Sequence, residues 1–213
     1  MKNVIFGTFL STSLLLSACS LGASTNEQLT DTLAKVYEEE QGYRDAQEQL
    51  AQLEKKEQTT FNSVMELTQD KLDEVSTMVD FLNESLNKRL TSIDSEHESI
   101  LAAQESLSSL DKLVEETKDE AAKKTLTNLK DSLVARYEAH QVVYDEYIEL
   151  TTLQTELYDM LPNEETEQVQ LQEQVQKINK QNDIVQSSIN AFNETTKKVN
   201  DTKNDVFETL NKK

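Results

Sequence analysis

The first residue of the chain whose side chain and neighbours indicate a chemical reaction is Cys19. Cys19 is the only cysteine among 213 residues and ends the segment Leu16-Ser17-Ala18-Cys19. Small side chains before a cysteine fit the peptidase that cleaves bacterial lipoproteins, and the thiol accepts a diacylglyceryl group. We therefore predict cleavage before Cys19 and lipidation of its thiol. The alternative is an ordinary secretory signal in which a cysteine occurs by chance.

The residues before this lipobox have the pattern of a signal peptide. Lys2 supplies a positive charge, and the apolar runs Val4–Leu10 and Leu14–Leu16 follow it. These runs are too short to cross a bilayer as a permanent helix. We predict a lipoprotein signal peptide over residues 1–18, and a lipid anchor with a short linker over 19–26. Two acyl chains on one residue anchor a protein stably, which predicts a location on the extracytoplasmic face of the cell membrane.

Two histidines and two glutamates form the other set of residues that could carry chemistry. If the chain folds back near residues 69 and 118, His97, His140 and Glu40 lie at one level, with Glu96 adjacent. Two imidazoles and two carboxylates could bind a metal. Di-iron bundles, however, use a glutamate three residues before each histidine, and here those residues are an aspartate and a tyrosine. We predict no metal or other cofactor and favour a polar layer that fixes helix register. Whether the four side chains form such a layer is left open.

Four of the six tyrosines fall within one short stretch, at Tyr137, Tyr144, Tyr147 and Tyr158. They could present an aromatic face to a sugar or a protein, or fill wide layers of a helical bundle with their hydroxyls at the edge. The chain has no tryptophan, which favours the second interpretation. No Ser-His-Asp set, glycine-rich phosphate loop or second thiol is present in the sequence. We predict no catalytic residues and no enzymatic activity.

The composition favours long helices with narrow apolar stripes. Only 36% of the residues are apolar, and the chain has three glycines and one proline, which suits neither a sheet protein nor a wide core. Removal of residues 1–18 leaves 20 basic and 40 acidic residues, a formal charge of −20. A surface this negative has no basic stripe to replace phosphate counterions, which excludes nucleic acid as a partner.

Apolar residues recur at alternating spacings of three and four along the chain, the pattern of helices that pack along a narrow seam. The clearest seam is Leu171, Val175, Ile178, Val185, Ile189, Phe192, Val199, Val206 and Leu210. Polar side chains interrupt the earlier seams at Glu40, Gln47, Glu54, Glu57, Arg89, Glu96, Arg136 and Gln154. Since the first seam carries four of these, we expect the first helix to be the least well packed.

Helix boundaries follow from the residues that end one seam and start the next. Proline cannot continue a helix, so Pro162 marks one boundary, where Asn163 is predicted to cap the following helix. Thr117 and Glu120 have the spacing of a capping box. We predict helices near 27–67, 70–116, 119–161 and 164–211. The fold class is therefore all-α, an elongated antiparallel four-helix bundle with coiled-coil-like packing, in one domain over 27–213.

Several short segments resemble a known family. They are Leu53–Gln58, Arg136-Tyr137, Tyr144–Tyr147, Glu156–Leu161, Ile178-Asn179 and Phe192-Asn193. With the lipobox and the helices, they make the chain similar to the YkyA-like cell-wall-binding lipoproteins of Gram-positive bacteria. The resemblance implies a helical extracytoplasmic domain that associates with the cell wall, and it brings no catalytic residues. The alternatives are a protein-interaction or spacer module that docks another envelope protein and, third, a metal-binding bundle.

Overall fold

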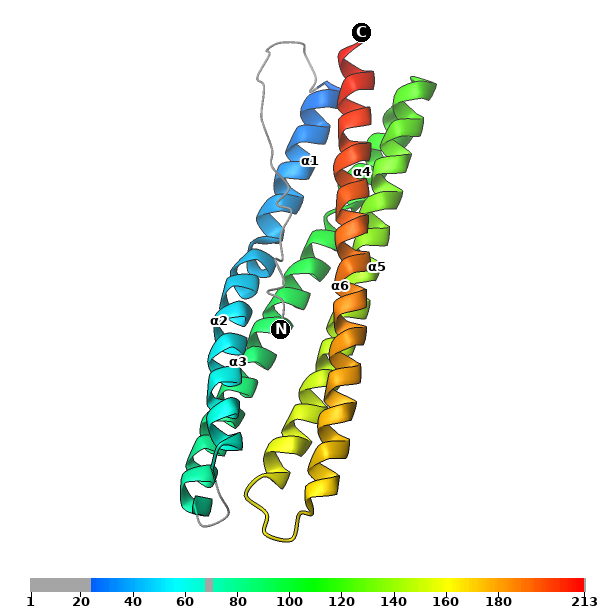
Figure 1. Cartoon of the computed structure of the whole chain (residues 1–213). Helices are drawn as coiled ribbons and strands as arrows, with labels where there is room; N and C mark the ends of the chain where they lie inside the picture. Colours follow the sequence, from blue (N-terminus) through cyan, green and yellow to red (C-terminus); the bar gives the residue numbers. More distant parts are fainter. Residues whose placement is uncertain (1–23, 68–70, 213) are drawn as a thin grey trace. The chain divides into compact units, whose positions relative to one another are not determined.

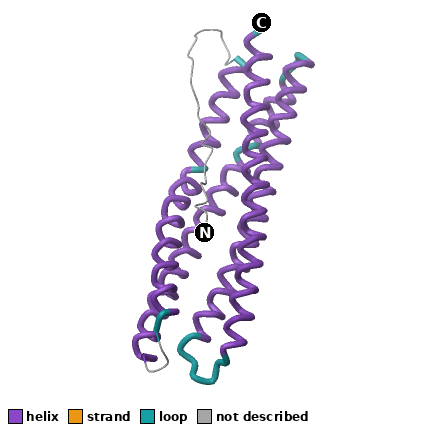
Figure 2. The backbone as a smooth tube through the Cα atoms, in the orientation of Figure 1, coloured by secondary structure: helices purple, strands orange, loops and turns teal. Residues whose placement is uncertain are grey.

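The computed structural model describes residues 24–67 and 71–212, and these are almost entirely helical. The predicted signal peptide and Cys19 lie outside the described residues. The six helices are α1 (Thr25–Glu39), α2 (Gln41–Met65), α3 (Leu72–Glu105), α4 (Ser108–Glu116), α5 (Glu120–Met160) and α6 (Gln168–Asn211). The described residues contain no strand (Figure 2), so the all-α prediction is confirmed. None of the described helices is long and apolar enough to cross a membrane.

The helices form two compact units, and each unit contains four packed helical segments. Unit 1 comprises residues up to Tyr43, Glu98–Gln141 and Asn190 onward, and unit 2 comprises Arg44–His97 and Val142–Ile189. Helices α2, α3, α5 and α6 contribute to both units, α2 with only its first three residues in unit 1. In unit 1, α4 continues in the direction of α3, and the segments α1, α3 with α4, α5 and α6 alternate in direction; in unit 2, the segments of α2, α3, α5 and α6 alternate in the same way (Figure 1). The predicted four-helix bundle with antiparallel neighbours is therefore confirmed within each unit.

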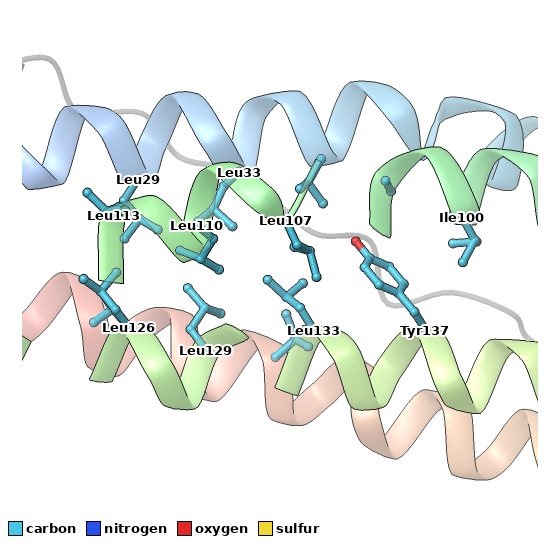
Figure 3. Packing of buried hydrophobic residues seen from close by; sticks show 14 residues of the cluster. Leu29, Leu33, Ile100, Leu107, Leu110, Leu113, Leu126, Leu129, Leu133 and Tyr137 are labelled. Atoms are coloured by element: carbon cyan, nitrogen blue, oxygen red, sulfur yellow. The ribbon is translucent and has the colours of Figure 1, made fainter. Parts of the chain in front are cut away.

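Unit 1 has a continuous apolar core. Figure 3 shows Leu29, Leu113 and Leu126 at one level and Leu33 with Leu110 at the next. From the first of these levels to the next, the residue numbers rise along α1 and α5 but fall along α4. Helix α4 is therefore antiparallel to α1 and α5. The cluster of buried residues is Leu29, Leu33, Val36, Ile100, Ala103, Leu107, Leu110, Leu113, Leu126, Leu129, Leu133, Tyr137, Val199 and Val206.

The expectation of a loosely packed first helix is wrong for α1. Leu29 and Val36 are 0% exposed and Leu33 is 1% exposed. The expectation fits α2 better, because its 25 residues bury only Ala46, Leu50, Glu57 and Val64. The predicted first helix is thus two helices of different character, one in each unit.

The break between α1 and α2 has a local cause. Glu40 is the C-cap residue of α1, and its backbone N–H donates to the carbonyls of Val36 and Glu38. The hydroxyl of Ser99 donates to the carbonyl of Glu39 at 2.5 Å and accepts from the N–H of Tyr43 at 3.1 Å. One side chain from α3 therefore satisfies backbone groups on both sides of the break, which is how an inserted side chain stabilises an interruption.

Other boundaries differ from the prediction by a few residues. The predicted helix 70–116 is divided at Ser106 and Leu107 into α3 and α4. Asp119, not Thr117, caps α5, since its carboxylate accepts from the N–H of Ala122 at 2.8 Å. The Thr117 hydroxyl instead donates back to the Leu113 carbonyl, at the end of α4.

Helix α6 also begins later than predicted, at Gln168. The Asn163 side chain does not cap it, because it accepts from the N–H of Glu165 within the turn. Gln170 reaches back to the N–H of Glu167 at 2.8 Å and caps the helix there. In both α5 and α6, the helix begins where a side chain can accept a hydrogen bond from one of the first free backbone N–H groups.

Candidate functional site

A buried ion pair joins three helices of unit 1. Arg136 on α5 donates from Nη1 and Nη2 to the two carboxylate oxygens of Glu40, at 2.5 and 3.2 Å. Its Nε donates to the hydroxyl of Thr196 on α6 at 3.0 Å, and Tyr137 adds a hydroxyl bond to Glu40 at 3.1 Å. Arg136 and Glu40 are each 3% exposed. The planar guanidinium matches the carboxylate with two hydrogen bonds, the strong form of this contact.

Aromatic rings surround the guanidinium of Arg136. Its Cζ lies 4.9 Å from the ring centroid of Phe192 and 5.7 Å from that of Tyr43. The His140 ring meets both rings edge-on, at 5.5 Å from Phe192 and 6.0 Å from Tyr43. A cation held over aromatic faces in a site with little water is stabilised by the ring quadrupoles. His140 is therefore part of the packing around the ion pair.

Unit 2 contains a second buried arginine. Arg89 on α3 donates from Nη1 to Glu57 at 2.6 Å and to Gln154 at 3.0 Å, and from Nε to the Tyr147 hydroxyl at 2.8 Å. The Tyr147 hydroxyl in turn donates to Glu54 at 2.8 Å. Burial disfavours the charged guanidinium, but Tyr147, Glu57 and Glu54 together raise the pKa of Arg89 above its ordinary value. Arg89 is thus permanently charged and held by α2 and α5.

We call each buried arginine, together with the side chains that bind it, an arginine layer. Three tyrosines of α5 take part in these two layers. Tyr158 donates to Glu57 at 2.7 Å in unit 2, as Tyr137 does to Glu40 in unit 1. Burial, and then the adjacent carboxylate, raises the pKa of Tyr137 and of Tyr158 well above 10. Burial also raises the pKa of Tyr147, although Arg89 opposes the shift. The structure favours the interpretation in which tyrosines fill bundle layers and use their hydroxyls on polar core groups.

The four residues considered as a polar layer fall into different units. Glu40 and His140 belong to unit 1, where Glu40 pairs with Arg136. Glu96 and His97 belong to unit 2. Glu96 is 1% exposed and accepts from Gln47 at 2.6 Å, and the His97 ring stacks on Tyr144 at 4.1 Å.

Within unit 1, Glu40 and His140 belong to the packing around Arg136, and within unit 2 Glu96 contacts Gln47 and His97 contacts Tyr144. Among the described residues, no group of three or more histidine, cysteine, aspartate or glutamate side chains is arranged to hold a metal ion.

The two ion pairs are the polar feature that sequence reasoning missed. The prediction treated Glu40 and Glu57 as weak points of one seam, and Arg89 and Arg136 as interruptions of others. The sequence did indicate such pairs, because a charged side chain on a buried helix face needs a partner of opposite charge. Without one, its burial costs too much free energy. The pairing could not be assigned from the sequence, because the breaks in the first two helices shift the register between seams.

The fold gives the structural class of the chain. In the part that the structure describes, it is an all-α helical bundle in which buried arginines pair with buried glutamates.

Comparison with known proteins gives the family. A family model described as "Putative cell-wall binding lipoprotein", YkyA, matches residues 24–209. The chain is also similar to an uncharacterized lipoprotein, YkyA, of Bacillus subtilis (strain 168). The identity is 25% over 206 residues, which cover 97% of this chain and 92% of the relative. The chain therefore belongs to the YkyA family of lipoproteins, and the predicted family is confirmed. No solved structure matches it significantly.

Proposed function

We propose that the chain is a non-enzymatic protein anchored by lipid on Cys19 to the extracytoplasmic face of the cell membrane, and that its bundle associates with the cell wall. One observation carries the proposal. The segment Leu16-Ser17-Ala18-Cys19 precedes a helical region that belongs to a family described by cell-wall binding and lipoprotein character. The lipobox explains the anchor, and the family description gives the direction in which to look for a ligand.

The buried polar groups support a non-enzymatic role. Charged groups in an active site stand where a substrate can reach them, and their pKa values serve a reaction. Arg89, Arg136, Glu40 and Glu57 are each less than 5% exposed and are bonded to one another in pairs. Such pairs fix which helix faces meet, which is the property a spacer or binding scaffold needs.

The anchor is tested by replacing the thiol, with Cys19→Ser expressed beside the unaltered chain in a Gram-positive host. We expect the unaltered protein to sediment with membranes and to carry the mass of a diacylglyceryl group on residue 19. The variant should lack that mass, because serine has no thiol to accept the lipid. An unaltered protein that carries no lipid on residue 19 would contradict the proposal.

Wall association is tested by sedimenting residues 20–213 with purified sacculi, with and without teichoic acid and with and without chelator. The formal charge of −20 after cleavage opposes direct contact with teichoic-acid phosphates. We therefore expect saturable binding that depends on teichoic acid and is lost with chelator, because divalent cations bridge the two anionic surfaces. Absence of binding under every condition would remove the support for a wall ligand.

The second candidate is a protein-interaction or spacer module, and the sparse packing of α2 favours it. Four buried side chains in 25 residues leave most of this helix available. A photo-crosslinking residue at the exposed Lys56, compared with one at Lys35 on the well-packed α1, would sample partners in living cells. A partner captured from position 56 only would support docking on α2, and recovery of self-contacts alone would count against it.

A further inference from the structure

The start of α1 is fixed firmly to unit 1. The Ser24 N–H donates to the Glu27 carboxylate at 2.7 Å, and the Glu27 N–H donates to the Ser24 hydroxyl at 3.2 Å, which completes a capping box. One turn later Leu29 is 0% exposed. Such a cap and such an apolar contact together fix where the chain enters the helix. The position of Ser24 is therefore set by the core of unit 1.

Three segments gather at this end of unit 1. The side chain of Asn26 donates to that of Asn211 at 3.1 Å, which joins the start of α1 to the end of α6. Leu29 lies at the level of Leu113 and Leu126 (Figure 3), so the turn between α4 and α5 lies beyond the same level. We call residues 24–28, 116–120 and 207–212 the anchor end.

The anchor end is close to Cys19 along the chain. Five peptide steps separate Cys19 from Ser24, and a fully extended chain of that length spans at most about 18 Å. By contrast, the part of α6 from Glu194 to its last residue, Asn211, is about 26 Å long at the rise of an α-helix. A lipid on Cys19 therefore keeps the anchor end near the bilayer and leaves room for the opposite end of unit 1 to stand away from it.

Charge favours the upright arrangement over one in which unit 1 lies on its side. The described residues of unit 1 include 18 acidic and 11 basic side chains. An anionic membrane surface repels acidic groups over about one Debye length, roughly 8 Å at physiological salt. The anchor end holds five of these acidic side chains, Glu27, Glu116, Asp119, Glu120 and Glu208, and two of the basic ones, Lys118 and Lys212. Standing on this end therefore keeps the other 13 acidic side chains of unit 1 farther from the membrane surface.

The anchor end has no exposed large apolar side chain to insert into the bilayer. Within the described residues, the exposed large hydrophobic side chains are Met65, Phe81, Leu101, Val142, Val169 and Ile184. None of them belongs to the anchor end. Contact with lipid there is therefore polar and stays at the level of the head groups.

We infer that the anchor end of unit 1 is the surface that faces the membrane, resting on lipid head groups while the rest of unit 1 points away. The inference rests on the proposed lipidation of Cys19. It also restricts the proposed function, because a wall polymer or a partner protein must then bind surfaces other than the anchor end.

The test uses the full lipidated chain with one added cysteine, at Lys212, Lys118 or Glu194. Because the lipid blocks the Cys19 thiol, a maleimide fluorophore labels only the added cysteine. Each protein is reconstituted in vesicles of phosphatidylglycerol and phosphatidylethanolamine that carry a nitroxide on the head group, a quencher of short range. We expect quenching at positions 212 and 118 to be several-fold stronger than at position 194, which lies on α6, the helix that ends directly before position 212.

Equal quenching at positions 194 and 212, or stronger quenching at 194, would overturn the inference while leaving lipid anchoring intact. Mass spectrometry of each labelled protein separates the two proposals. If residue 19 carries no lipid, the proposed anchor fails and the inference fails with it. If residue 19 is lipidated, the quenching order alone decides the orientation of unit 1.

Discussion

Each of the two units buries one arginine, but the hydrogen bonds of the arginine and its glutamate are more complete in unit 1 than in unit 2. In unit 1, Arg136 engages both oxygens of Glu40, and aromatic rings cover the guanidinium. In unit 2, Glu57 uses only Oε1, and its buried Oε2 has no hydrogen-bond partner among the described residues. The second carboxylate of that layer, Glu54, is 47% exposed. A buried charge is stabilising only when its hydrogen bonds are complete, so unit 1 has the stronger layer.

The charge of each unit follows the same trend, although both units bury 16 apolar or aromatic side chains among the described residues. The described residues of unit 1 include 18 acidic and 11 basic side chains, and those of unit 2 include 21 acidic and only 8 basic ones. Excess charge of one sign destabilises a compact state through self-repulsion. We therefore expect unit 1 to be the more stable unit.

The largest expected effect comes from removing one arginine. Arg136→Met leaves Glu40 buried without its counter-ion, which should lower the free energy of unfolding by about 3–5 kcal/mol. Arg89→Met should cost less, because the half-exposed Glu54 regains water when the guanidinium is removed. Urea unfolding measures both changes. Two equal losses would contradict the difference between the layers.

Truncation of a buried leucine should show the next largest effect. Leu33→Ala in α1 removes a side chain that is 1% exposed, and Leu50→Ala in α2 removes one that is 7% exposed. Such truncations cost about 2–5 kcal/mol, depending on how far the site can collapse. We expect Leu33→Ala to fall in the upper part of that range and Leu50→Ala in the lower part. The reverse order in thermal unfolding would show that α2 packs more tightly than its burial indicates.

Alkaline pH should weaken unit 2 more than unit 1. The pKa of a buried tyrosine is raised in the folded state, so above pH 10 the unfolded chain loses phenolic protons that the folded chain keeps. Stability then falls as pH rises, by up to about 1.4 kcal/mol per pH unit for each tyrosine. Unit 2 has two such residues, Tyr147 and Tyr158, and unit 1 has Tyr137. Tyr158→Phe should therefore reduce the slope of stability against pH between 10 and 12, and an unchanged slope would contradict this account.

An exposed ion pair should contribute the least. Lys88 and Glu84 lie 2.6 Å apart, but their side chains are 58% and 61% exposed. Water screens such pairs, and ordering two long side chains offsets the attraction. Glu84→Gln should therefore leave the urea midpoint unchanged, and it serves as the control for the arginine variants because Lys88 is adjacent to Arg89.

The helices and their buried faces could be predicted from the sequence, because every helix of a bundle repeats apolar residues at spacings of three and four. Val185, Phe192 and Val199 are buried as their spacing indicated, and so are the polar interruptions Arg136 and Glu96. The break at Glu40 could not be predicted, since the stabilising side chain, Ser99, is 60 residues away in sequence from the carbonyl of Glu39 that it binds, and the break at Ser106 was not predicted either. Those breaks set which charges meet. The Cys19 prediction depends on local sequence alone and needs no fold.

Hydrogen exchange of the unaltered protein and of Arg89→Met tests the central claim, that each unit is organised around its own arginine layer. The backbone amides around Glu57, Arg89 and Tyr158 should lose protection in the variant, because removal of the guanidinium leaves the Glu57 carboxylate buried and uncompensated. The amides around Leu33, Leu129 and Arg136 should keep the protection they have in the unaltered protein. A uniform loss of protection across both sets would contradict the account, since it would mean that one cooperative core, rather than two separate layers, holds the bundle together.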